Sequence, residues 1–190
     1  MNRNAAYWLL VSILLVASAA FGSSALARKA AVAKPGVTVE TGALVRLEKP
    51  VDGDTLLVKV GDDTATLRLV GVKTFDQDAT KDAFSGYGRE AVNAINVIAQ
   101  DKPLRVLGNV PAKDKHGRIL ATLFVDDEDL GLALVRRGVA MVYTAFPFPS
   151  MPSYLREQEI ARAERKGLWG DPAAVKRADL LARQWREEAP

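Results

Sequence analysis

The sequence predicts an α+β, β-rich fold: a closed barrel of five short antiparallel strands, three packed helices and an extra C-terminal helix. Runs rich in β-branched and aliphatic residues alternate with Gly and Asp turns in the first half of the chain. A helical segment interrupts the strands after the third, and helical periodicity dominates after the fifth. With 48% hydrophobic and 26% charged residues, the composition is that of a globular protein.

The first three strands are expected to form a meander. They are predicted over Val37–Leu47, Thr55–Val60 and Thr64–Val72, and the turns between them contain Asp52-Gly53-Asp54 and Gly61-Asp62-Asp63. The polar segment 73–87 is expected to be a loop.

The remaining elements complete the barrel and cover it. A helix is predicted over Gly88–Ala99, followed by strands over Pro103–Val110 and Arg118–Val125. One helix after the third of five strands is the arrangement of an OB-type barrel. Further helices are predicted over 129–138, 153–166 and 171–187, which gives a barrel domain over 37–170 and a helical extension over 171–190.

The N-terminal segment is expected to direct the protein to its location rather than to form part of the folded barrel. Residues 4–27 carry no charge, follow Arg3 and end in Ala25-Leu26-Ala27, so 1–27 has the layout of a cleaved secretory signal. This predicts export to the periplasm or the extracellular space. The alternative is a membrane anchor, because the uncharged stretch is long enough to span a bilayer. Residues 28–36 are expected to be a linker.

Composition restricts the chemistry that this chain can perform. It has no cysteine and one histidine, His116, in a basic turn that is expected to be solvated. This excludes thiolate nucleophiles, cysteine-ligated metals and two-histidine metal motifs. Catalysis would therefore depend mainly on carboxylates, arginines, lysines and backbone groups. The net charge of +3 permits a polyanionic partner without requiring one.

Three short segments carry charges close to predicted strands. Asp52 and Asp54 flank a glycine at a strand end, where oxygen ligands suit a hard cation. Arg68 lies between two leucines in an apolar strand, and Arg118 opens the fifth strand. Taken singly, each feature is also typical of a turn or of a solvated strand face.

Taken together, these segments resemble the staphylococcal-type thermonuclease family. The matching segments follow the family's order from about Ala43 to Trp169: Asp52–Thr55, Leu67–Val72, Tyr87–Ala91, Asp114–Arg118, Leu134–Ala140 and Gly167–Trp169. The resemblance implies a calcium-dependent phosphodiesterase that acts on DNA and RNA.

The resemblance also assigns roles to individual residues. Asp54 would bind the metal with Asp52 supporting it, and the Thr74 carbonyl would be a further ligand. Arg68 and Arg118 would hold the phosphate, because an arginine fork suits phosphate oxygens.

One four-residue segment departs from the family's pattern at three positions, two of which carry chemistry. Where the family has Asp-Thr-Pro-Glu, this chain has Lys73-Thr74-Phe75-Asp76, so a lysine replaces a metal-binding aspartate. Asp76 takes the place of the glutamate proposed as general base. One unit-charge pair at about 4 Å is worth roughly 4 kcal/mol at an effective dielectric constant near 20, so Lys73 opposes a divalent cation.

Three hypotheses about this site stay open. Asp76 or Asp78 completes a metal site, with Ca²⁺ as cofactor. Alternatively, the Lys73 ammonium replaces the cation, pairs with Asp54 and touches the phosphate, with no cofactor. In the third, Lys73 and Asp54 form a salt bridge, hydrolysis is lost and the barrel only binds.

The sequence thus predicts a nuclease-like phosphodiesterase that hydrolyses DNA or RNA, preferably single-stranded, by attack of water. We expect a monomer without an obligate protein partner. The alternative function is a catalytically impaired nucleic-acid-binding module on the same barrel. The predicted catalytic residues are Arg68, Asp76 and Arg118.

Substrate-binding residues are predicted outside this catalytic set. Lys73, Lys115 and Tyr143 are expected to contact the substrate. Phe146 and Phe148 lie among prolines, where they offer either a stacking surface for bases or contacts with the core.

Overall fold

The computed structural model describes residues 37–78 and 83–188. The predictions for 1–27 and 28–36 fall outside these residues. No helix within the described ranges has both the length and the apolar character needed to cross a membrane. The strands are β1 (Leu44–Asp52), β2 (Thr55–Val60), β3 (Asp63–Leu69), β4 (Val72–Lys73), β5 (Pro103–Lys113), β6 (Ile119–Val125), β7 (Glu128–Asp129) and β8 (Met141–Val142). The helices are α2 (Ser85–Ala99), α3 (Leu130–Arg136), α4 (Met151–Ala163), α5 (Pro172–Glu188) and the short 3₁₀ helix η1 (Gly167–Gly170).

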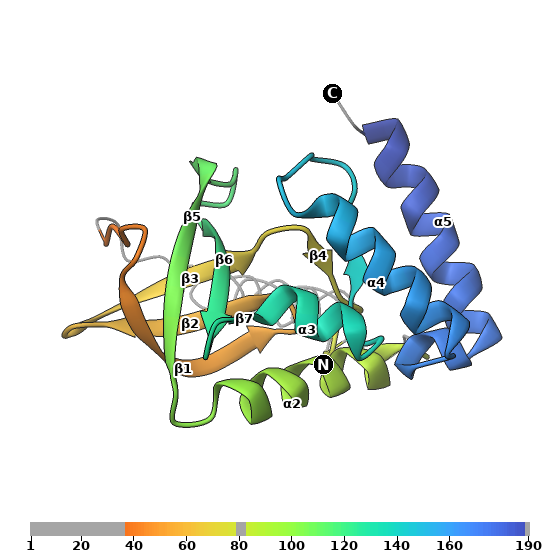
Figure 1. Ribbon diagram of the computed structural model, residues 1–190, viewed down its shortest axis with the longest axis horizontal. Coiled ribbons are helices and arrows are strands. Elements are labelled where there is room, and N and C mark those ends of the chain that lie inside the picture. The colour runs from red at the N-terminus through yellow and green to blue at the C-terminus, as the bar shows by residue number, and fades with distance from the viewer. Residues whose placement is uncertain (1–36, 79–82, 189–190) are drawn as a thin grey trace, which may run out of the picture. The chain divides into compact units, whose positions relative to one another are not determined.

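Five strands form the closed barrel that the sequence predicts (Figure 1). Their order is β3-β2-β1-β5-β6, and pairing between β3 and β6 closes the ring. The closing pair is parallel, with Leu67 opposite Ile119, whereas the sequence predicted antiparallel strands throughout. A closed ring with an odd number of strands must contain at least one parallel pair, because directions cannot alternate all the way round.

The barrel interior explains why these segments form strands. Apolar residues of the strands fill it, such as Leu56 and Val58 in β2 and Leu67 in β3, and in β6 every second residue is buried. α2 adds Ile95 and α3 adds Leu134 to the same apolar core. The two helices contact each other, and they also contact β1 and β6 respectively.

Several predicted boundaries shift in the structure. The first strand begins at Leu44 rather than Val37 and continues to Asp52, with irregular pairing near Pro50. The third strand ends at Leu69 rather than Val72. α2 begins at Ser85, three residues earlier than predicted. β4 and β8 were not predicted, because two-residue strands are too short to show a periodic pattern.

α5 packs on a second apolar cluster. Ala174, Ala178 and Trp185 of α5 are buried there with Trp169 of η1 and Met141 of β8. Because Met141 pairs with Lys73 in the β4–β8 ladder, this cluster extends to the strand beside β4. The division between a domain over 37–170 and an extension over 171–190 stays a prediction.

Gly138 is a position where a side chain should not be tolerated. Its φ is +69°, and a Cβ would collide with the carbonyl of Lys166. Its own carbonyl accepts a hydrogen bond from Leu168 N–H at 2.9 Å, so the two segments are in close contact. We expect Gly138→Ala to lower the free energy of unfolding by about 1–3 kcal/mol, measured by urea denaturation. Gly61→Ala is the matched control, since Gly61 also has positive φ but open space around it. An equal loss in both variants would contradict the packing argument.

Candidate active site

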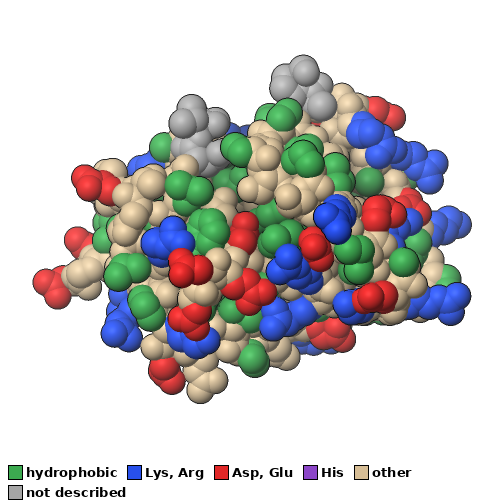
Figure 2. Space-filling model, viewed as in Figure 1, with side chains coloured by type: hydrophobic (Ala, Val, Ile, Leu, Met, Phe, Trp, Pro, Cys, Tyr) green, Lys and Arg blue, Asp and Glu red, His purple; other side chains and the backbone are tan. Residues whose placement is uncertain are grey.

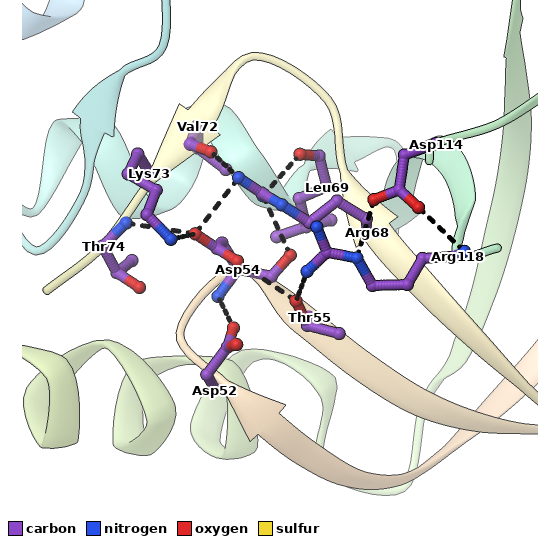
Figure 3. A network of polar contacts seen from close by, with 10 residues as sticks. All are labelled: Asp52, Asp54, Thr55, Arg68, Leu69, Val72, Lys73, Thr74, Asp114 and Arg118. Atoms are coloured by element: carbon purple, nitrogen blue, oxygen red, sulfur yellow. Dashed lines mark hydrogen bonds and ion pairs between the residues drawn. The ribbon is translucent and has the colours of Figure 1, made fainter. Parts of the chain in front are cut away.

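Asp54 is the centre of a polar network at the turn between β1 and β2 (Figure 3). Its side chain is 1% exposed. The Asp54 N–H donates to Asp52 Oδ1 at 2.9 Å, which fixes the turn. Gly53 permits close packing here, because a Cβ at this position would come within 2.6 Å of the Ala91 Cβ on α2. The turn is therefore held against α2, and Asp54 is directed inward.

Arg68 is buried beside Asp54 and donates to the chain itself. Its Nη2 lies 3.2 Å from Asp54 Oδ2 and donates to the Val72 carbonyl at 2.8 Å. Its Nη1 donates to the carbonyls of Asp54 at 3.1 Å and Leu69 at 2.9 Å. Both terminal nitrogens are thus used to join the β1–β2 turn to the segment after β3. Binding of phosphate by Arg68 stays a prediction, and it would require the guanidinium to give up one of these contacts.

Lys73 extends from β4 to the same carboxylate. Its Nζ lies 3.3 Å from Asp54 Oδ2, and its side chain is 46% exposed. Thr74 N–H donates to that oxygen at 3.3 Å, and Thr55 Oγ1 donates to Oδ1 at 3.1 Å. Thr74 thus contributes its N–H to the network, whereas the resemblance implied a role for its carbonyl.

The two carboxyl groups of the turn have opposite pKa shifts. Burial acts to raise the pKa of Asp54, but the positive charges of Arg68 and Lys73 outweigh it, so this pKa lies below its ordinary value. For Asp52, burial and the nearby charge of Asp54 raise the pKa to about 6. Asp54 is therefore ionised at neutral pH, whereas Asp52 loses its proton near pH 6.

The raised pKa of Asp52 makes stability depend on pH. A pKa higher in the folded than in the unfolded chain gives stability that is complete below about pH 4 and lost as the pH rises through about 6. The loss is up to about 3 kcal/mol. In Asp52→Asn, whose amide oxygen can still accept the Asp54 N–H, we expect this contribution to disappear.

The measurement is urea unfolding of both proteins from about pH 4 to pH 7. The difference in unfolding free energy between Asp52→Asn and the wild type should grow in favour of the variant over this range. Parallel pH profiles would show that the Asp52 carboxyl is not perturbed.

Arg118 adds a second, more accessible guanidinium to the network. Its Nε donates to Asp114 Oδ2 at 2.7 Å, and its Nη1 donates to Thr55 Oγ1 at 3.2 Å. Its side chain is 29% exposed. Thr55 therefore connects Arg118 to Asp54, as Figure 3 shows. Hydrogen bonds from Arg118 and His116 hold the pKa of Asp114 below its ordinary value, although burial acts to raise it.

Other predicted site residues lie outside this network. Asp76 is exposed, and its Oδ1 accepts the Asp78 N–H at 2.8 Å. Lys115 is exposed in the turn after β5. Tyr143 N–H donates to the Gly71 carbonyl at 2.9 Å, which places Tyr143 directly after the β4–β8 ladder. The network drawn in Figure 3 does not include Asp76, Lys115 or Tyr143.

The aromatic residues near Tyr143 divide into buried and exposed ones. The Tyr143 ring packs edge-on against Trp185 of α5, with centroids 5.0 Å apart. Phe148 packs edge-on against the buried Tyr154, so it serves the core. Phe146 is 59% exposed, and its ring centroid lies 6.1 Å from that of Tyr143.

Three residues of the site were missed by sequence reasoning. Thr55 and Asp114 lie within the matching segments, and Asp114 comes four residues before Arg118, a spacing that could have indicated the pair. The contact of Trp185 with Tyr143 joins residues 42 positions apart, and nothing in the local sequence indicates it.

The donor set does not fit Ca²⁺. Calcium takes six to eight oxygen ligands, supplied by carboxylates, carbonyls and water. Here an ammonium and a guanidinium occupy one oxygen of Asp54. Within residues 37–78 and 83–188, no group of three or more acidic or histidine side chains is arranged to hold a metal ion.

Comparison with known proteins finds a matching family model and several relatives of this chain. A family model described as staphylococcal nuclease homologue matches residues 66–171. Protein ParB of Escherichia coli is 30% identical over 171 residues, which cover 83% of this chain and 85% of the relative. An uncharacterized endonuclease of Haemophilus influenzae is 27% identical, with 75% and 72% covered. The thermonuclease of Staphylococcus intermedius is 28% identical, with 71% and 80% covered.

Proposed function

Since the chain belongs to the family of staphylococcal nuclease homologues, we propose that it hydrolyses phosphodiester bonds in DNA or RNA. The observation that carries the proposal is the network in which Asp54, Arg68, Lys73 and Arg118 meet at one end of the barrel. Phosphoryl transfer requires mainly positioning and positive charge near the phosphate oxygens. Lys73 and Arg118 supply such charge on side chains that solvent can reach.

The contacts support different roles for the two arginines. Arg118 is oriented by Asp114 and Thr55 and is partly exposed, so it serves as the phosphate-binding fork. Arg68 is a positioning residue, because it ties the Asp54 turn to the carbonyls of Leu69 and Val72. Asp76, exposed three residues after Lys73, is the proposed carboxylate that orients or deprotonates the attacking water.

Binding should depend on the site rather than on a broad basic surface. On the face shown in Figure 2, basic and acidic side chains are interspersed. A single-stranded substrate suits a site with aromatic side chains nearby, because its unpaired bases are free to stack on them. Lys115 and Tyr143 are proposed to contact the substrate as well, and the protein is proposed to act as a monomer.

The test is cleavage of denatured DNA, duplex DNA and RNA by the purified full chain. We expect cleavage of the single-stranded substrates and a product set that shows internal cuts. An identically purified Arg118→Ala preparation controls for contaminating nucleases. Absence of cleavage of every substrate, with and without Ca²⁺, would refute the enzymatic function.

A binding module without hydrolysis is the second candidate, and the ion pair between Lys73 and Asp54 favours it. A carboxylate neutralised by an ammonium is a poor base and a poor metal ligand. In that case fluorescence anisotropy should show salt-dependent binding of single-stranded DNA by a chain that cleaves nothing. Neither binding nor cleavage would exclude both functions.

Phe146 provides a test of base stacking beside the site. Because stacking on an aromatic ring is worth about 1–3 kcal/mol per base, Phe146→Ala should weaken single-stranded DNA binding by roughly fivefold or more. Its exposure predicts little change in unfolding free energy. Leu44→Ala, at a similarly exposed apolar residue on β1, is the control. Equal affinities of Phe146→Ala and wild type would argue against a stacking role.

A further inference from the structure

Both carboxylate oxygens of Asp54 already accept from donors of the chain itself. Oδ2 receives Arg68 Nη2 at 3.2 Å, Lys73 Nζ at 3.3 Å and Thr74 N–H at 3.3 Å. Oδ1 receives the Thr55 hydroxyl at 3.1 Å. A carboxylate oxygen has two lone pairs, so the three donors leave none free on Oδ2, whereas Oδ1 keeps one. A divalent cation that bound both oxygens of Asp54 would have to displace donors that are already in place.

The backbone around Lys73 keeps its ammonium at this position. Lys73 is paired with Met141 in the β4–β8 ladder, and the carbonyl of the preceding Val72 accepts Arg68 Nη2 at 2.8 Å. β4 is therefore fixed on both sides, and only the flexible part of the lysine side chain can move. With Arg68 and Lys73 against Asp52 and Asp54, the four charges sum to zero when both carboxyls are ionised. A divalent cation would add two positive charges to this balanced group.

We infer that the Lys73 ammonium is a built-in cation that replaces a divalent metal ion, so that this site works without one. One side of the ammonium faces Asp54, while 46% exposure of the side chain leaves another side open to solvent. A substrate phosphate oxygen would bind the ammonium on that open side. The role of Lys73 toward the phosphate rests on the proposed function. The inference that this site binds no divalent cation does not depend on that function.

The experiment measures Ca²⁺ binding and nucleic-acid chemistry separately, on the full chain. Isothermal titration with Ca²⁺ to about 10 mM should give no saturable binding to the wild type. Chelator should change single-stranded DNA affinity and cleavage by less than about twofold. Lys73→Met, which keeps the aliphatic stem and removes the charge, should lose at least about tenfold in DNA affinity or cleavage. Lys59→Met, at an exposed lysine of β2, is the matched control and should lose less than about twofold.

Distinct results would overturn this inference or the proposed function. Saturable Ca²⁺ binding by the wild type at one site, abolished in Asp54→Asn, would overturn the inference. So would cleavage that requires Ca²⁺, or a Lys73→Met variant that folds and behaves like wild type toward DNA. A chain that binds no Ca²⁺ and binds DNA through Lys73 but never cleaves it would leave the inference standing and refute the enzymatic function.

Discussion

Replacement of Asp54 by alanine is expected to lower the free energy of unfolding by about 3–5 kcal/mol, because it leaves a buried guanidinium without its counter-charge. Arg68 is 8% exposed, and its Nη2 would retain only the Val72 carbonyl. The hydroxyl of Thr55 and the N–H of Thr74 would lose their acceptors as well. Lys73 contributes less to the loss, since water can reach its ammonium.

Urea unfolding at neutral pH measures this effect, with Asp114→Ala as the control for loss of an aspartate from a partly exposed ion pair. Asp114 pairs with Arg118 at 2.7 Å and accepts the N–H of His116 and of Arg118, and this site is partly exposed, so its loss should cost about 1–2 kcal/mol. The double variant Asp54→Ala, Arg68→Met should recover part of the stability that Asp54→Ala loses, because the unpaired buried charge is gone. If Asp54→Ala cost no more than Asp114→Ala, the network would not be the stabilising centre of this region.

The barrel strands could be predicted because each one depends on the residue pattern within its own segment. Alternation of Leu56 and Val58, or of Leu67 and Leu69, places one face of each strand in the core. The Asp-Gly-Asp turn between β1 and β2 was also visible in the sequence. The parallel closure between β3 and β6 was not, because the pairing of Leu67 with Ile119 is set by ring closure rather than by either strand.

The site was predicted only in part, because several of its contacts join residues that are far apart in the sequence. Alternation correctly turns Arg68 away from Leu67 and Leu69, and on that basis alone a solvated face is the expected environment. Arg68 is buried instead, because the segment after β3 brings the carbonyl of Val72 over the guanidinium. Substitution of a lysine at position 73 was visible in the sequence, but its pairing with Asp54 depends on the position of β4 beside β8. A two-residue ladder has no pattern from which to predict it.

Arg118→Ala is expected to lower kcat/KM for single-stranded DNA by about 10²–10³-fold, if hydrolysis uses this guanidinium as proposed. Asp114 and Thr55 hold Arg118 by Nε and Nη1, which preorganises the fork before substrate arrives. Because the side chain is 29% exposed, its removal should cost at most about 1 kcal/mol of unfolding free energy, so the loss of rate will not reflect unfolding.

Two further variants separate charge from geometry at this position. Arg118→Lys keeps the charge but cannot donate from a planar fork, so it should recover only a small part of the rate. Asp114→Asn keeps an acceptor for Nε while removing the negative charge, and it should lower the rate by about tenfold or less. Full activity in Arg118→Ala would transfer the phosphate-binding role to Lys73 and Arg68. Arg68 would then have to release Asp54 or a backbone carbonyl in every turnover, which the buried geometry opposes.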